Sequence, residues 1–525
     1  MIGGEFSYEL LHAVHPIAEE ELQRALHNLT DAELLYVRGI APDAIYLFKH
    51  ALIQDEAYEA LLKSRRKELH RLVARTIEAK FSAFREAHPE VLAHHWTDAS
   101  EIEPAIVEWS RAGKAAEARG AFTEALRSYY QALDQLNRLA ESAERDSREL
   151  QLRSSVYTML WMTRGPSAPD TLEAAELVTA LAEKSGNLAL VVLLMLTTGL
   201  SALLASRDTD AILALADQAL ELARREGSPG TLLSAHSLQI QVRISHGDLA
   251  GVEEHFAAEM KIADDPTSRQ NYSSIFVQEF AVAAASAWML GRPDLARQRF
   301  AEMIAVTNAN NPYELAMSQL LAAEFQFGLR EYKQAEAFAT HAFELSEKHQ
   351  FALVAAGSKC SLGKVRAVLG RATEGVELLR QGIAGALEIG LRHWLLFNKI
   401  WLAQAQAAEG AIVEALETVE QALQENTDEP LVLPATFLLR GELRLKQGQS
   451  EAAEADFRKA LTLARSMGAK GGELRAATSL ARLLGDTGRR DEAHSLLAEI
   501  YNWFKEGFDT ADLKEAKALL DELNR

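Results

Sequence analysis

The stretch WSRAGKAAEARGAFTEALRSYYQAL, which runs from Trp109 to Leu133, decides the fold. Its small and aromatic residues stand at the offsets of a tetratricopeptide repeat, a pair of antiparallel helices; they are Trp109, Gly113, Ala125 and Tyr129. The small residues let the two helices approach closely, and the aromatic side chain fills the gap to the next hairpin. The stretch therefore predicts a helical hairpin that packs against a neighbour of the same kind.

The same pattern recurs along the chain. LRGELRLKQGQSEAAEADFRKAL, from Leu439 to Leu461, repeats it with Gly441, Ala453 and Phe457. A small residue that opens the second helix of each hairpin recurs every 38 to 45 residues, at Gly251, Ala296, Ala335, Gly375, Ala415, Ala453 and Ala493. This spacing exceeds the roughly 34 residues of the standard repeat, which indicates longer helices or loops. We expect an all-α superhelix of tetratricopeptide-like hairpins whose inner face is a groove.

The composition is that of a globular protein. The chain has 525 residues, of which 48% are hydrophobic and 25% are charged, so several domains or a repeat array are expected. The formal charge of −20 argues against broad binding to nucleic acid or anionic lipid, because both depend on Lys and Arg. A single cysteine, Cys360, fits a reducing compartment, and the N-terminus lacks the features of a signal peptide, so we expect a cytoplasmic protein.

One uncharged stretch, LALVVLLMLTTGLSALLAS from Leu188 to Ser206, has about the minimum length of a membrane span. Thr197, Thr198 and Gly199 dilute its apolar character, and no aromatic belt flanks it. We therefore interpret the stretch as a buried helix of the array, with a membrane span as the alternative.

The first eighty residues follow another pattern. Two segments with helical apolar spacing, SYELLHAV and IAEEELQRALHNL, precede two strand-like runs, LLYVRG and IYLFKH, joined by the turn IAPDA. A helix resumes at Ala51. This order is that of a winged-helix module with one β-hairpin. We therefore predict two domains, a winged-helix module over residues 1–85 and the repeat superhelix over residues 86–525.

The helix expected from Ala51 onward is long and amphipathic. Its apolar side chains keep a spacing of three and four residues from Tyr58 to Ile77, with Leu62 and Leu72 among them. The opposite face is basic and carries Lys63, Arg65, Arg66, Lys67 and Arg71. Such a face could contact DNA phosphates, but a solvated helix face is the usual explanation for a run of charges.

The sequence carries no signature of a catalytic or metal site. A phosphate-binding loop needs a glycine, four residues and then Gly-Lys-Ser or Gly-Lys-Thr, and no such string occurs. His94 and His95 are adjacent, so they point to different sides of a helix, and neither an HExxH motif nor a paired-cysteine spacing appears. We expect no enzyme activity, no cofactor and no metal in this chain, and we interpret the two histidines as packing or surface residues.

Three segments resemble a known family. They are GGEFSYELLHAV, LFKHALIQDEAYEALLKSRRKELHR and the closing block from Glu473 to Leu523. Together they look like the C-terminal half of large bacterial regulators that join an adenylate/guanylate cyclase domain, or another output domain, to a STAND-class ATPase and a tetratricopeptide tail. The resemblance implies a nucleotide switch that closes over ADP while the repeats sense a partner. The ATPase core and the cyclase are absent here, and in the family GGEFSYELL follows the ATPase core, so the chain is expected to begin at a domain boundary.

The resemblance implies a specific role for His50, which lies in LFKHALIQD. In STAND proteins a histidine at this point of the winged helix hydrogen-bonds the terminal phosphate of ADP, so His50 is a candidate phosphate contact when an ATPase core is present. Ala51 stands where one branch of the class has an aspartate, and this departs from the family pattern. The alternative is that His50 caps the following helix or packs under the hairpin.

These observations predict a non-catalytic interaction and regulatory protein. The repeats would bind a protein or peptide partner in their groove, and the chain would be coupled to a nucleotide switch in a longer parent or in a partner, through an ATPase core encoded upstream. Two alternatives stay open. One is a truncated cyclase or ATPase regulator whose catalytic domains lie outside this chain, and the other is a transcription regulator that binds DNA through the winged helix.

Overall fold

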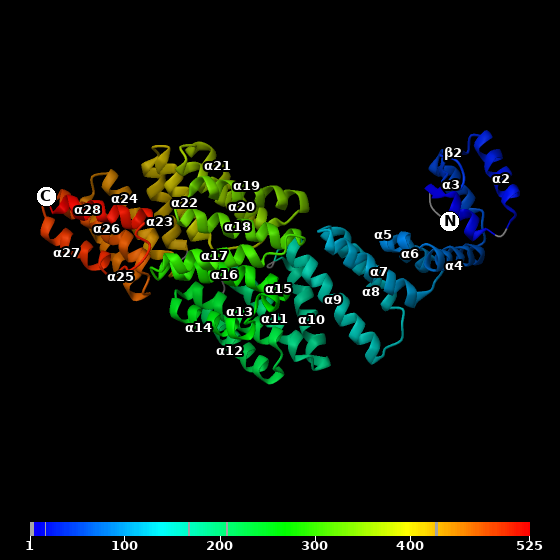
Figure 1. The fold of residues 1–525 in the computed structure, drawn as a ribbon, viewed down its shortest axis with the longest axis horizontal. Helices are drawn as coiled ribbons and strands as arrows, with labels where there is room; N and C mark the ends of the chain where they lie inside the picture. The colour runs from blue at the N-terminus through cyan, green and yellow to red at the C-terminus, as the bar shows by residue number, and fades with distance from the viewer. Residues whose placement is uncertain (1–4, 16, 166–167, 206–207, 426–428, 525) are drawn as a thin grey trace. The chain divides into compact units, whose positions relative to one another are not determined.

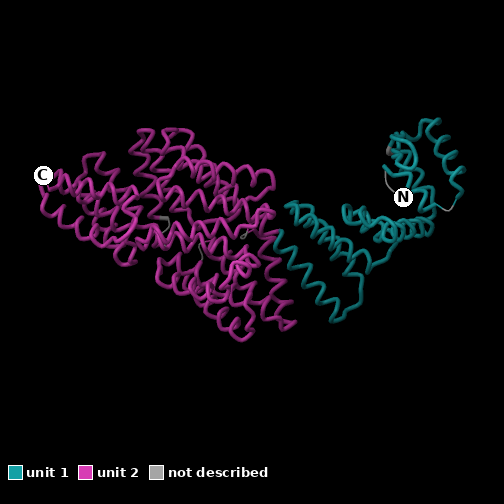
Figure 2. Tube along the Cα trace, viewed as in Figure 1, with its two compact units in different colours: residues 1–159 teal, residues 160–525 magenta. Residues whose placement is uncertain are grey.

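The chain forms two compact units, residues 1–159 and residues 160–525 (Figure 2). The computed structural model describes residues 5–15, 17–165, 168–205, 208–425 and 429–524. The division lies within a long helix after Met159, so the predicted boundary at residue 85 falls inside the first unit. The assignment of residues 1–85 and 86–525 to two domains stays a prediction.

The first unit combines a small sheet with helices (Figure 1). Its elements are β1 Glu5–Ser7, α1 Tyr8–Val14, α2 Glu19–Asp31, β2 Leu35–Arg38, β3 Ile45–Phe48, α3 Ala51–Glu59, α4 Lys63–Lys80, α5 Ser82–Ala87, α6 Pro89–Asp98, α7 Ile102–Ala118, α8 Phe122–Leu136 and α9 Ala143–Arg164, which crosses the division between the units. The predicted order of two helices, a β-hairpin and a helix is present. The sheet has a third strand, β1, which the sequence did not reveal because three residues are too few to show alternation.

One face of the sheet packs on the first two helices. Strand order is β1-β3-β2 and both pairings are antiparallel, with Tyr36 opposite Leu47 and Leu35 opposite Phe48. Because side chains alternate along a strand, Leu35 and Phe48 share the face that joins Leu22 and other apolar residues of α1 and α2 in a small core. Tyr36 and Leu47 therefore lie on the opposite face.

The prediction of a single helix from Ala51 to Ile77 is wrong, because the structure has two helices there, α3 and α4. Arg66 stabilises the break: its guanidinium donates hydrogen bonds to the carbonyl oxygens of Glu59 and Leu61, at 2.8 and 2.9 Å, and satisfies the end of α3. Leu62 is extended, with φ −58° and ψ 142°. The helix axis restarts there, so the predicted apolar face breaks up: Leu62 and Leu72 are exposed, whereas Val73 and Ile77 are buried.

The second unit is built from helices only, as far as the described residues show. They are α10 Pro169–Ser185, α11 Leu188–Leu204, α12 Thr209–Glu226, α13 Pro229–His246, α14 Leu249–Ile262, α15 Pro266–Asn271, α16 Ser273–Met289, α17 Pro293–Val306, α18 Pro312–Gly328, α19 Tyr332–His349, α20 Ala352–Val368, α21 Ala372–Glu388, α22 Leu395–Ala408, α23 Ile412–Glu425, α24 Leu433–Lys446, α25 Ser450–Ser466, α26 Lys470–Asp486, α27 Arg490–Tyr501 and α28 Ala511–Leu523. The chain is thus an all-α protein of stacked helical hairpins, preceded by a module that contains the only β-hairpin of the described residues.

The hairpins stack in register with the sequence repeat. Each anchor residue of the repeat lies in the first turn of a second helix, from Gly251 in α14 to Ala493 in α27. The first helix of one hairpin contacts the first helix of the next, as α18 contacts α20 and α24 contacts α26. Consecutive hairpins therefore form one superhelix, with clusters of buried apolar side chains between neighbouring hairpins.

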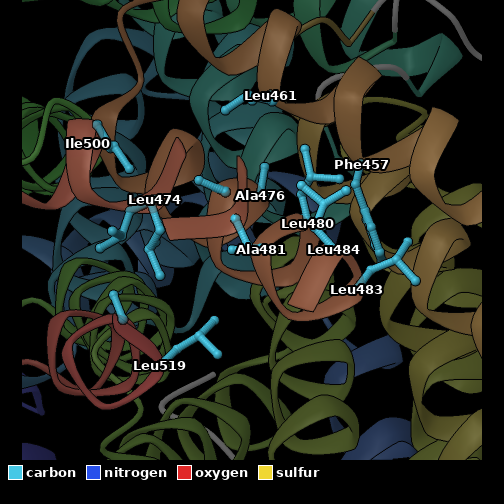
Figure 3. Packing of buried hydrophobic residues seen from close by; sticks show 14 of the residues in the cluster. Phe457, Leu461, Leu474, Ala476, Leu480, Ala481, Leu483, Leu484, Ile500 and Leu519 are labelled. Carbon is cyan, nitrogen blue, oxygen red and sulfur yellow. The ribbon is translucent and has the colours of Figure 1, made fainter. Parts of the chain in front are cut away.

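The last hairpins show how this interior is filled. Figure 3 shows Phe457 of α25 near Leu480 and Leu484 of α26, with Leu519 of α28 farther away in the same cluster. These side chains are buried and belong to one core cluster. Burial of apolar surface between neighbouring hairpins is thus the main force that holds the array together.

The apolar run from Leu188 corresponds to α11. Its side chains pack with α12 and α13 in a core that includes Val192, Ala216 and Leu238. Within the described part of the chain, no helix combines the length and the hydrophobicity that a bilayer crossing requires. Ser206, the last residue of the run, lies outside the described residues.

Candidate docking surface of the first unit

His50 lies between the sheet and α3 and is exposed. Its backbone is extended, with φ −137° and ψ 131°, and its carbonyl oxygen accepts a hydrogen bond of 3.1 Å from the amide of Ile53. The imidazole makes no capping hydrogen bond. His50 is therefore the N-terminal boundary residue of α3, and its side chain neither caps the helix nor packs under the hairpin. The side chain of Ala51 lies outside the described residues.

The surface beside His50 is apolar and open. Tyr36 and Leu47, the cross-strand pair on the free face of the sheet, are 53% and 41% exposed. The side chain of Lys49 lies on this same face of the sheet, because its ammonium group is 5.6 Å from the centre of the Tyr36 ring. The chain therefore reaches His50 along the edge of an uncovered apolar patch.

The helix that follows His50, α3, buries little of its side-chain surface against the rest of the unit. None of its described side chains, residues 52–59, is buried, and Leu52 is 76% exposed. We call Tyr36, Leu47, Leu52 and Leu62, together with His50, the His50 surface. Of the exposed large apolar side chains in the described residues, nine lie between Leu29 and Phe84 and eleven are spread over the much longer remainder of the chain. Exposed apolar side chains are therefore denser in this part of the chain than in the rest of the described residues.

The predicted basic face is largely paired with acidic groups. Arg65 contacts Glu68 at 2.9 Å, and Arg71 contacts Glu101 at 2.5 Å. Arg66 is held against the end of α3 by Glu59 and two carbonyl oxygens. Lys63 and Lys67 are exposed. Because three of the five cations already face carboxylates or carbonyl groups, the face offers little free positive charge for phosphate.

A buried histidine pair, which the sequence did not reveal, joins α4 to α6. The Nδ1 atoms of His70 and His95 are 2.9 Å apart, and the hydroxyl of Tyr58 lies 3.2 Å from Nε2 of His70. One Nδ1 must carry a hydrogen and the other must not, so both rings can be neutral. Burial, followed by the nearby charge of His70, lowers the pKa of His95 to about 3. The two histidines are 25 residues apart in sequence, and no local sequence pattern predicts their contact.

The neighbouring His94 points elsewhere, as adjacent residues on a helix must. Its ring packs edge-on against Trp109, with 4.6 Å between the ring centres. Within the described residues, no group of three or more His, Cys, Asp or Glu side chains is placed to hold a metal ion. The geometry therefore gives His94 and His95 packing partners, and we assign them no ligand.

The repeat residues lie where helices meet. A methyl group placed on Gly113 would fall 2.4 Å from the ring of Tyr129, and one on Gly441 would fall 2.5 Å from the ring of Phe457. The Trp109 indole donates a hydrogen bond of 2.9 Å to Thr97. The small residues Ala125, Ala335, Ala415, Ala453 and Ala493 are fully buried. The glycine thus leaves room for the aromatic ring of its own hairpin in two repeats that are far apart in the chain.

A pair of buried carboxyl groups in the second unit also escaped the sequence analysis. Glu279 of α16 accepts hydrogen bonds from Ser237 at 2.6 Å and Gln241 at 3.3 Å, whereas neither oxygen of Glu259 has a hydrogen-bond partner. Burial raises the pKa of Glu279 to about 7, and burial together with the charge of Glu279 raises the pKa of Glu259 well above its usual value. The buried Asp456, by contrast, contacts Arg440 and Arg444.

Comparison with known proteins identifies no family for this chain, since no protein-family model matches it. An uncharacterized protein of Rhizobium meliloti (strain 1021) is 22% identical over 500 residues, which are 92% of this chain and 48% of that protein. The chain thus spans about half the length of this curated relative.

Solved structures that resemble the chain are distant from it. The APC/C hetero-tetramer Cut9-Hcn1 gives a TM-score of 0.47 at 13% identity, covering 90% of this chain and 88% of that one. A Rap protein complexed with competence and sporulation factor gives 0.47 at 14% identity, covering 70% and 99%. NprR in complex with its cognate peptide NprX gives 0.37 at 15% identity, covering 56% and 82%. At such scores and identities, none of the three determines a function for this chain.

Proposed function

We propose that the chain is a non-catalytic interaction and regulatory module of the cytoplasm, with no cofactor of its own. Its first unit docks through the His50 surface on an ATPase core, supplied by a longer parent or by a partner. Its repeats bind a protein or peptide, and binding there is coupled to the nucleotide state of the core.

The observation that carries the proposal is the open His50 surface. Leu52 and Leu62 are 76% and 77% exposed, and burial of each would stabilise a complex by about 1.5–3 kcal/mol. His50 is exposed beside Leu52 in the chain, and its imidazole makes no capping bond. A domain seated on the apolar groups would therefore bring its own ligand within reach of His50. The resemblance to STAND regulators supports ADP as that ligand.

The basic face of α4 gives the DNA-binding alternative less support. Its arginines are engaged with Glu59, Glu68 and Glu101. We therefore favour a protein partner for the first unit over nucleic acid.

The test starts from the genes next to this one. A P-loop domain encoded upstream is expressed, and its ADP affinity is measured alone and with the chain. We expect the chain to tighten ADP binding. His50→Ala should weaken it by roughly 10- to 100-fold, because a hydrogen bond to a charged oxygen contributes about 1.5–3 kcal/mol. Leu52→Asp should prevent association.

The matched control is His27→Ala, since His27 is an exposed histidine of the same unit that lies on α2, where it contacts Asp31. This variant should leave ADP affinity unchanged. The same ADP affinity with and without the chain would contradict the proposal. ATP turnover by the chain alone would refute its non-catalytic part.

A further inference from the structure

Two buried carboxyl groups lie near each other in the second unit. Glu259 belongs to α14 and Glu279 to α16, and these two helices are in contact. The charge of Glu279 acts on Glu259 and helps to shift its pKa. The helices belong to different hairpins, because α14 pairs with α13, whereas α16 pairs with α17. The two carboxyl groups therefore lie at a joint between repeats.

Little at this joint compensates a negative charge. Both oxygens of Glu259 and Oε2 of Glu279 are buried and have no hydrogen-bond partner. Oε1 of Glu279 accepts hydrogen bonds from two side chains of α13, Ser237 at 2.6 Å and Gln241 at 3.3 Å. Both donors are neutral. A buried carboxylate without a paired cation is costly, so the pair favours its protonated forms.

The charged side chains on the surrounding helices have other partners. Arg243 of α13 contacts Asp248 at 2.6 Å, and Nδ1 of His236 lies 2.9 Å from Nδ1 of His255. The other neighbouring helices contribute Arg299 paired with Glu253, Arg269 with Glu302, Glu314 with Ser273, and Lys470 with Glu473. Within the described residues, no cation is placed to neutralise Glu259 or Glu279.

Burial makes the joint sensitive to pH. It raises the pKa of Glu279 from 4.5 to about 7. The contribution of such a carboxyl to the stability of the closed joint is fully present below its unfolded pKa of 4.5 and is lost as the pH rises through 7. Between pH 6 and pH 8 the equilibrium between the closed and the open joint should therefore shift about tenfold toward the open form.

We propose that Glu259 and Glu279 form a proton-sensitive joint between the α13–α14 hairpin and α16. While at least one of the two carboxyl groups is protonated, the hairpin stays packed on α16. When both are ionised, their repulsion and their need for water loosen the contact between α14 and α16. The loosening is local, because the turn of the hairpin also packs elsewhere: a methyl group on Gly247 would fall 2.7 Å from the sulfur of Met467.

This joint is a regulatory device of the repeat array. Each hairpin of such an array positions the next one, so a change of packing at one joint alters the angle between the repeats on its two sides. The inner face formed by these repeats therefore changes with pH around neutrality. The inference involves neither nucleotide nor the first unit, so the docking proposal can fail separately.

The test is hydrogen exchange of the amides in α14 and α16 of the full chain, expressed as protection factors to remove the intrinsic effect of pH. The comparison is with a variant that combines Glu259→Gln and Glu279→Gln. Glutamine has the size of a protonated glutamate and cannot ionise, so this variant should keep the joint closed. The ratio of wild-type to variant protection should fall about tenfold between pH 6 and pH 8. The histidine pair, present in both proteins, cancels in this ratio.

The matched control is Glu254→Gln, because Glu254 is an exposed glutamate of the same helix, α14. It should keep the pH dependence of the wild type. The amides of α25 are an internal control, since the buried Asp456 of that helix is paired with Arg440 and Arg444 and stays ionised over this range. A ratio that is constant from pH 6 to pH 8 would overturn the inference.

Infrared spectroscopy gives a second measurement, which does not depend on opening. The difference spectrum between the wild type and Glu279→Gln should contain the C=O absorption of a protonated carboxyl at pH 6 and lose it by pH 8. A difference spectrum that shows only a carboxylate at pH 6 would also overturn the inference.

Discussion

Replacing Gly441 by Ala tests the repeat packing at one defined contact. The new methyl group would lie 2.5 Å from Cε1 and 2.7 Å from Cδ1 of the Phe457 ring, and 3.2 Å from the carbonyl oxygen of Ala453. Carbon atoms do not approach so closely, so the ring or the helix must move. Phe457 is fully buried in a cluster with Leu480, Leu484 and other residues of the last hairpins (Figure 3).

The expected cost follows from two opposing effects. Overpacking a filled core costs about 1–3 kcal/mol, whereas replacing a helical glycine by alanine stabilises the helix by about 1 kcal/mol. Because the ring is fully buried, the upper half of the overpacking range applies. We expect Gly441→Ala to reduce local stability by about 1–2 kcal/mol.

The measurement is hydrogen exchange of the amides in α24 and α25, because a repeat array opens locally and a global transition would average over many hairpins. Gly472→Ala is the control. Gly472 is also helical, but its added methyl group would meet Ala464 at an ordinary 3.5 Å. This variant should slow exchange in α26 slightly. If Gly441→Ala proved as stable as the wild type, the assignment of Gly441 as the space that admits the aromatic ring would be refuted.

Three further predictions concern burial. Glu279→Gln should stabilise the second unit at pH 8 and not at pH 4, by about 3 kcal/mol at most. The folded pKa of Glu279 is raised from 4.5 to about 7, so the contribution of this carboxyl to the free energy of unfolding is fully present below pH 4.5 and is lost by the time the pH has risen through 7. Urea unfolding at both pH values checks this, and an equal effect at both would contradict it. His95→Gln should weaken the acid sensitivity of the first unit. Burial beside His70 lowers the pKa of His95 to about 3, so the contribution of His95 to stability is present above the unfolded pKa of 6.5 and falls by about 2 kcal/mol between pH 6.5 and pH 5. A melting temperature that keeps the wild-type pH dependence would argue against this prediction. Ala453→Phe should cost roughly 1–3 kcal/mol by overpacking α25, and an unchanged melting temperature would count against the buried position of this alanine.

The fold of the repeats could be predicted from the sequence because a repeat hairpin contacts mainly its neighbours. The residue types that those contacts require recur at a fixed interval. They are a glycine or alanine where two helices touch and an aromatic ring opposite it. The pairs Gly113 with Tyr129 and Gly441 with Phe457 show the same demand in two repeats. The β-hairpin of the first unit was equally local, since β2 and β3 pair across a short turn. Local contacts leave a periodic trace in the chain.

The functional features depended on the tertiary structure. The sequence predicted one helix after His50, but the structure has two, and the Arg66 side chain folds back on the carbonyl groups of Glu59 and Leu61 and stabilises the break. His70 meets His95 although 25 residues separate them. Arg297 meets Asp509 across 212 residues. Which distant residues meet is set by the twist that many hairpins accumulate, and a small change in that twist per repeat would bring different side chains together. Such contacts have no fixed spacing, so they leave no pattern that a sequence can show.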